Sequence, residues 1–81
     1  MDKDLSVRDL IKLLRAHGCA VELTPGQYLK ARRGSGPDHR HWTQHAHKGE
    51  KDYFDRRKVA AARRALGFGG LTDEEFYSPI A

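Results

Sequence analysis

The chain has 81 residues, with fifteen Lys and Arg, eleven Asp and Glu, and a single cysteine. This length suits one small domain, the lone cysteine excludes an internal disulfide framework, and no apolar run approaches the roughly 20 residues of a membrane span. Residues 1–70 carry fifteen basic and eight acidic side chains, a net charge of +7, which favours a polyanionic partner such as nucleic acid over a mere solubility charge. The N-terminus does not resemble a signal peptide, so we expect a cytoplasmic protein with no membrane partner.

A first helix is predicted over about residues 6–17. Ser6 followed by Asp9 is typical of a helix N-cap with an acidic first turn, and Gly18 stands where a helix ends. The apolar residues of this segment recur at helical spacing and form one stripe. An adjoining flank carries three cations, Arg8, Lys12 and Arg15.

Three strands are expected next, paired as an antiparallel meander. Alternation of apolar and polar residues over residues 19–24 indicates a half-buried strand, and Pro25-Gly26 indicates a tight turn. A second strand over about residues 27–33 would turn Tyr28, Lys30 and Arg32 to one face. The glycine-rich residues 34–38 predict a loop before the third strand.

The third strand has the most informative pattern of the chain. Residues 39–47 read His-Arg-His-Trp-Thr-Gln-His-Ala-His. In an extended strand Trp42 and Ala46 project toward one face, and the opposite face carries four histidines, His39, His41, His45 and His47. Imidazoles donate or accept hydrogen bonds, ligate metals and titrate near neutrality, so this row predicts either a functional surface or solvated polar positions.

Asp52 is expected to cap a second helix over about residues 53–66, which Gly67 would end. Helical angles place the apolar residues of this segment on one side and four arginines on the opposite side, Arg56, Arg57, Arg63 and Arg64. The two arginine pairs would lie about 10 Å apart along the axis, as a comb for phosphates. A solvated helix face is the alternative.

Residues 69–81 differ in composition from residues 1–68 and are interpreted as an acidic C-terminal tail. Thr72 and Glu75 form a capping-box pattern, which predicts a single helical turn. We expect that turn to dock Phe76 and Tyr77 on the body of the domain.

The predicted order is helix, three strands, helix. This is an α+β fold of the type α-β-β-β-α, and both helices are expected on the apolar face of a three-stranded antiparallel sheet. The other face would stay open and display the histidine row beside Tyr28, Lys30 and Arg32.

With residues 9–18 (DLIKLLRAHG) and residues 63–68 (RRALGF), this arrangement resembles the HicA family of small toxins over about residues 6–68. The resemblance implies a double-stranded-RNA-binding-domain-like (dsRBD-like) fold, messenger RNA interferase activity and an inhibitory antitoxin partner. The family carries its catalytic histidine in a Gly-Ser-His segment, where this chain has Gly26-Gln27-Tyr28. Tyrosine ordinarily titrates at about pH 10 and is a poor general base, so the family mechanism does not transfer to Tyr28. The family's other frequent histidine corresponds to His45 or His47.

RNA cleavage by transesterification needs a base for the 2′-hydroxyl and an acid for the leaving oxygen. Neighbouring histidines in the row have Cα atoms about 6.5–7 Å apart and could flank one phosphate, whereas His41 and His45 are about 13 Å apart. If the chain is catalytic, we expect His41, His45 and His47 to act with Tyr28 nearby. His-x-His pairs could bind zinc, but no third ligand is evident, so neither a metal nor another cofactor is predicted.

We therefore predict a HicA-like protein that binds nucleic acid, RNA before DNA. The binding residues are assigned to both helices and the second strand, namely Arg56, Arg57, Arg63, Arg64, Lys30, Arg32, Arg8, Lys12 and Arg15. Two alternatives stay open: a non-catalytic DNA or RNA binder, and a protein-interaction module such as an inhibitor or a host-targeting protein.

Overall fold

The computed structural model describes the backbone of residues 1–81 and all side chains except that of Asp38. Its 3₁₀ turns cover Gly36–Asp38, Gly49–Lys51 and Ser78–Ile80. The helices and strands, in chain order, are β1 (Leu5–Ser6), α1 (Val7–Ala16), β2 (Ala20–Leu23), β3 (Tyr28–Arg33), β4 (Arg40–His45), β5 (Tyr53–Phe54), α2 (Arg56–Ala65) and α3 (Asp73–Tyr77). The fold is mixed α+β with a three-stranded antiparallel sheet, as the sequence predicts.

The sheet is the expected meander, in the order β2-β3-β4. Its register sets Tyr28 of β3 opposite His45 of β4, and Arg32 opposite His41. A separate ribbon joins β1 to β5, with Leu5 opposite Phe54. Two-residue strands are too short to produce a periodic pattern, so the sequence does not predict this ribbon.

The first helix begins and ends close to the predicted residues. The Ser6 hydroxyl accepts a hydrogen bond from the Asp9 N–H at 3.1 Å, which satisfies one of the free donors at the start of α1. Gly18 has a φ of 88°, a conformation in which glycine meets no Cβ clash, and the chain turns there into β2.

The second helix begins later than predicted, and its cap is a different residue. Asp55 caps α2 by accepting from the N–H groups of Arg57 and Lys58, both at 3.0 Å. The prediction of a helix from residue 53 capped by Asp52 was wrong, because Tyr53 and its neighbour pair with β1 first. The Asp52 carboxylate instead accepts from the Tyr53 N–H at 2.8 Å.

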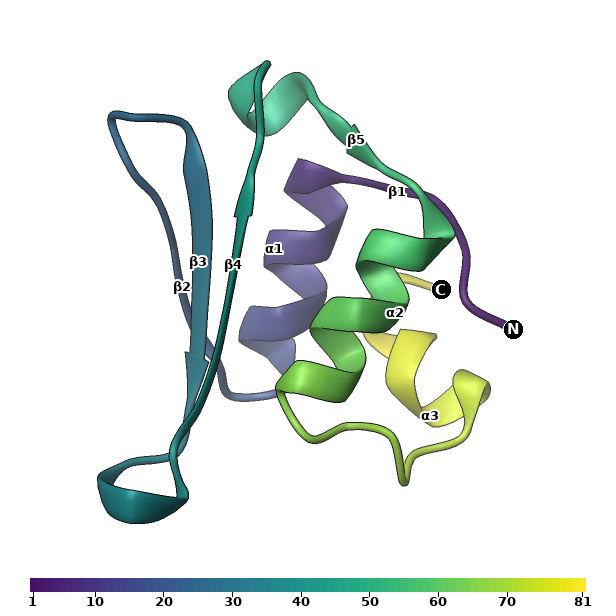
Figure 1. The fold of residues 1–81 in the computed structure, drawn as a ribbon. Helices are drawn as coiled ribbons and strands as arrows, with labels where there is room; N and C mark the ends of the chain where they lie inside the picture. The colour runs from purple at the N-terminus through teal and green to yellow at the C-terminus, as the bar shows by residue number, and fades with distance from the viewer.

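The molecule has three layers, as Figure 1 shows. The sheet forms the first layer, α1 and α2 lie together on one side of it, and α3 packs on these helices from the side away from the sheet. The sheet's inner face is apolar. Trp42 packs its ring edge-on against Phe54 at 5.9 Å, and Ala46 is fully buried, so the predicted inward direction of both is confirmed.

The C-terminal segment is docked on this core. Phe76 and Tyr77 of α3 are buried, as expected. The His17 ring stacks on the Phe76 ring at 5.3 Å, and its Nε2 lies 2.7 Å from the Phe76 carbonyl oxygen. Among the residues that the structure describes, no helix is both long enough and apolar enough to cross a membrane.

Candidate nucleic-acid interface

The face of the sheet that points away from the helices carries the predicted polar row. Along β3 the side chains alternate, so that Leu29 and Ala31 are buried whereas Tyr28, Lys30 and Arg32 are exposed. The register places His45, Thr43 and His41 of β4 directly opposite these three exposed residues. Cross-strand neighbours on one face have Cβ atoms about 4.5–5.5 Å apart, so the side chains of β3 and β4 form one continuous surface. We call this surface the outer face.

The histidines of the outer face form two pairs. The rings of His39 and His41 stack at a centroid distance of 5.6 Å, and those of His45 and His47 meet edge-on at 4.0 Å. Because β4 covers only Arg40–His45, the first and last histidines of the row flank the strand. The predicted pairing of neighbouring histidines is therefore present, and His41 belongs to a different pair from His45 and His47.

Tyr28 joins the second pair. Its ring lies 4.8 Å from that of His45, which places the His45 imidazole between the rings of Tyr28 and His47. Tyr28 keeps 46% of its surface exposed. Of the predicted group of His41, His45, His47 and Tyr28, the last three form an aromatic cluster at one end of the outer face, and His41 lies apart from them, beside His39.

A strained turn holds this cluster in place. Gln27 has a φ of 64°, in the left-handed region that residues with a Cβ rarely adopt. Its carbonyl accepts from the Ala46 N–H at 2.7 Å, and the Tyr28 N–H donates to the Thr24 hydroxyl at 3.1 Å. The first bond ties the residue before Tyr28 to Ala46, between His45 and His47, and the second ties Tyr28 to the start of the turn.

The other end of the outer face is cationic and shallowly hollowed. One hollow is lined by Lys30, Arg32, His41 and Thr43, with Glu22 of β2 on its far side. A second hollow lies beside the loop that follows β3 and is lined by Arg32, Ser35 and His39, among others. Arg32 borders both hollows. The His39 Nδ1 lies 2.9 Å from the Gly36 carbonyl oxygen, which orients its ring toward this end.

Arg63 is not where its predicted role requires it. It is only 8% exposed, and its guanidinium pairs with Asp73 at 2.7 Å and with Asp2 at 3.1 Å. It also donates to the carbonyls of Leu71 and Phe68. The assignment of Arg63 to an exposed arginine face was wrong, because the N-terminal segment and α3 cover that flank of α2. Arg63 is therefore a structural residue and does not belong to the candidate binding surface.

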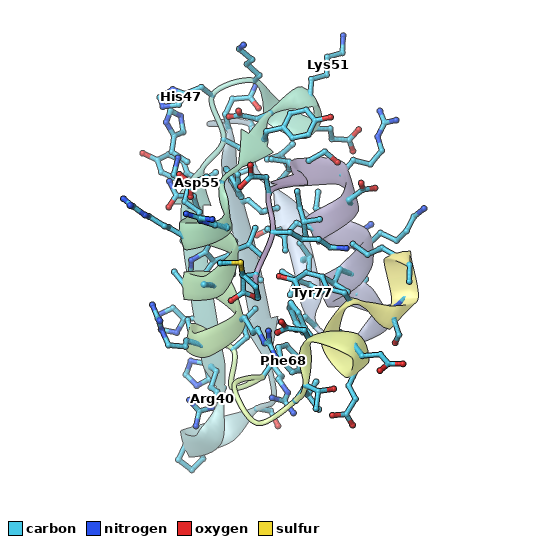
Figure 2. All side chains as sticks on the ribbon, turned by 90° about the vertical axis from the view of Figure 1, so that its right-hand side faces the viewer. Arg40, His47, Lys51, Asp55, Phe68 and Tyr77 are labelled. Carbon is cyan, nitrogen blue, oxygen red and sulfur yellow. The ribbon has the colours of Figure 1, made fainter. Side chains whose placement is uncertain are left out.

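Arg63, its partners Asp2 and Asp73, and Tyr77, which donates to Asp2, form a cluster in which the pKa values of two groups are shifted. Burial alone would raise the pKa of the Asp2 carboxyl, but hydrogen bonds from Tyr77 and Arg63 hold that pKa below its ordinary value. Burial, together with the hydrogen bond to Asp2, raises the pKa of Tyr77 from 10.0 to about 12. Figure 2 shows Tyr77 and Phe68 in this part of the molecule, toward α3. Through this cluster, residues near both ends of the chain bind to α2.

The three other predicted arginines of α2 are exposed, namely Arg56, Arg57 and Arg64. They lie on the helix layer and not on the outer face (Figure 1). The cations of α1 lie elsewhere again. Arg15 donates to the Val21 carbonyl of β2 at 3.0 Å, Arg8 lies 3.8 Å from Glu50, and Lys12 is exposed between them. The structure therefore divides the predicted cations among three surfaces and joins only Lys30 and Arg32 to the histidines.

The sequence does not predict the contacts that Arg33 makes. Arg33 donates to the carbonyls of Leu66 and Gly67 at 2.9 and 3.2 Å, and its guanidinium lies 4.2 Å from the centre of the Phe68 ring. It thereby satisfies free carbonyls at the C-terminal end of α2. No local pattern signals this contact, because β3 and the end of α2 are far apart in the sequence.

Among the side chains that the structure describes, no group of three or more His, Cys, Asp or Glu is arranged to hold a metal ion. Cys19 is buried, and burial raises the pKa of its thiol. The histidine pairs thus lack a third ligand within the described part of the chain.

Comparison with known proteins yields no relative. No protein-family model, no curated protein and no solved structure matches this chain.

Proposed function

We propose that this chain is a small HicA-like protein that binds nucleic acid, RNA in preference to DNA, through the outer face. The observation that carries the proposal is the cross-strand register, which sets Tyr28 opposite His45 and Arg32 opposite His41, with Lys30 between them on β3. One surface thereby combines cations for phosphates, aromatic rings for bases, and imidazoles that donate or accept hydrogen bonds.

The architecture supports the same proposal. The order α1-β2-β3-β4-α2, with both long helices on one side of the sheet, is the arrangement expected of a dsRBD-like HicA domain (Figure 1). The ribbon of β1 and β5 and the docked α3 are additions to that plan. The likeness to the HicA family otherwise rests on residues 9–18, in and just after α1, and on residues 63–68, at the end of α2 and just after it.

The exposed arginines of α2 supply a second cationic surface. Arg57 and Arg64 are seven residues apart, so they lie on one face, about 10 Å apart along the helix. Because α2 packs beside β4, an RNA longer than the outer face can pass around β4 and reach them. This surface adds affinity through charge without sequence preference.

A metal-independent ribonuclease is the second candidate function, and the pairing of the His45 and His47 imidazoles at one place on the outer face favours it. One imidazole would take the proton of a 2′-hydroxyl, and the 2′-oxygen would attack the adjacent phosphorus. The bond from phosphorus to the 5′-oxygen would then break, and the other imidazole would protonate that oxygen. The products would be a 2′,3′-cyclic phosphate and a 5′-hydroxyl. DNA lacks the 2′-hydroxyl and would not react.

The test is incubation of the full chain with a labelled, structured messenger RNA and with DNA of the same sequence, each with and without EDTA. One gel reports both retardation and cleavage. We expect retardation of RNA that weakens steeply as salt is raised, since each released counterion contributes to the slope. No retardation of either nucleic acid would overturn the proposal and favour a protein partner.

The ribonuclease candidate is tested on the same gel. Cleavage that survives EDTA and disappears in the double variant His45→Ala/His47→Ala, with RNA affinity kept within a few fold, would support it. Retardation without cleavage would reject it and leave a binding protein.

A further inference from the structure

The two ends of the outer face differ in chemistry. At one end the rings of Tyr28, His45 and His47 form the aromatic cluster, in which Tyr28 is about half exposed. At the other end Arg32 and His41 lie opposite each other and border the cationic hollow. Figure 2 shows how far apart these two ends lie, since His47 of the cluster and Arg40, the neighbour of His41 in β4, are at opposite ends of the molecule.

The distance between the ends matches a short nucleic-acid segment. Tyr28 and Arg32 are four residues apart on β3, which corresponds to about 13 Å. At 3.4 Å per nucleotide in a stacked strand, and more in an extended one, this distance spans roughly two to four nucleotides. Lys30 lies between the ends, on the same face.

Glu22 restricts the course of the ligand. It lies opposite Lys30 on β2 and lines the far side of the cationic hollow. A phosphate that approached β2 would meet this carboxylate, whereas β3 and β4 present Lys30, Arg32 and His41. The favourable course for a phosphate chain therefore runs along β3 and β4.

The aromatic end favours a single strand over a duplex. A base can stack on a protein ring only when its own face is free, and in a duplex that face is covered by the neighbouring bases. Tyr28 lies on the outer face of the sheet and is 46% exposed, which suits contact with an unstacked base. The rings of His45 and His47 support Tyr28 from the side.

We infer that the outer face takes single-stranded RNA, with one base stacked on Tyr28 and the adjoining phosphates along Lys30, Arg32 and His41. This inference rests on the proposed nucleic-acid binding and adds the ligand class and its placement. The base adds affinity that depends on the ring of Tyr28. The phosphates add affinity that depends on Arg32 and on salt.

The test compares three labelled ligands by fluorescence anisotropy: a short single-stranded RNA, an abasic strand of equal length and charge, and the corresponding RNA duplex. Tyr28→Leu should weaken binding of the single-stranded RNA by about 5- to 150-fold, the range for loss of one stacked base. It should leave binding of the abasic strand unchanged. Tyr28→Phe, which keeps the ring, should restore most of the lost affinity.

Two further variants complete the test, the first as a control and the second as a probe of the phosphate contacts. Tyr53→Leu removes a tyrosine that is 69% exposed on β5, away from the outer face, and should change no affinity. Arg32→Gln should weaken binding of both strands and reduce the salt slope by about 0.7.

Equal losses for the RNA and the abasic strand in Tyr28→Leu would overturn the inference, as would tighter binding of the duplex than of the single strand. Either result would leave nucleic-acid binding itself standing. Failure of all three ligands to bind would overturn both the inference and the proposed function.

Discussion

Replacing Arg63 by alanine should destabilise the fold much more than replacing Arg64, the next residue of the same helix. Arg63 is 8% exposed and pairs with Asp73 and Asp2 at 2.7 and 3.1 Å. Breaking a buried ion pair leaves charges without a partner and costs about 3–5 kcal/mol. Because the Asp73 side chain is 43% exposed, water screens part of this effect, and we expect a loss of about 2–4 kcal/mol.

This loss is a large share of the total stability, which for a domain of this size is on the order of 4–12 kcal/mol. At about 4–8 °C per kcal/mol, the loss of about 2–4 kcal/mol should lower the Tm of Arg63→Ala by about 8–32 °C. Circular dichroism during thermal and urea unfolding measures both quantities. Arg64→Ala removes an exposed arginine and should leave the midpoints unchanged. Equal midpoints for the two variants would refute the assignment of Arg63 to the structural cluster.

Three further predictions concern stability. The pKa of Tyr77 is raised from 10.0 to about 12 in the fold, so its contribution to stability is complete below pH 10 and is lost as the pH rises toward 12. Urea titrations over this pH range should show a smaller alkaline loss of stability for Tyr77→Phe than for the native chain. Equal alkaline losses for the two chains would contradict the role of Tyr77. Gln27→Gly should raise the free energy of unfolding by up to about 1 kcal/mol, because glycine adopts the positive φ without a Cβ clash. A free energy of unfolding below that of the native chain would show that Gln27 is not strained. Arg33→Ala removes two hydrogen bonds at the end of α2 and should lower the free energy of unfolding by about 1–3 kcal/mol. Amide hydrogen exchange at that end of α2 should become faster. Exchange as slow as in the native chain would contradict the capping role of Arg33.

The parts of the fold that the sequence predicts are those with local patterns. Alternation alone places Trp42 in the core and the histidines outside, because successive side chains of any strand point to opposite faces. The same rule, applied to β3, brings Tyr28 and Arg32 to the histidine face once the meander is assumed. Much of the candidate interface could therefore be predicted without coordinates.

The parts that could not be predicted depend on distant contacts. Helical periodicity puts Arg63 near the exposed side of α2, and only the docking of Asp2 and Asp73 on that flank makes it buried. The start of α2 is delayed by a ribbon between residues that are far apart in the chain, which moves the cap from Asp52 to Asp55. Arg33 likewise acts on carbonyls more than thirty residues away.

The most direct test of the central proposal is a two-dimensional ¹H–¹⁵N NMR titration of the labelled protein with a short single-stranded RNA. We predict that the amide shifts that change most belong to residues 28–32 of β3 and residues 39–47 in and around β4, with smaller changes at Arg57 and Arg64 of α2. Changes confined to α1 or to the α2 arginines, with the outer face unaffected, would contradict the proposed interface.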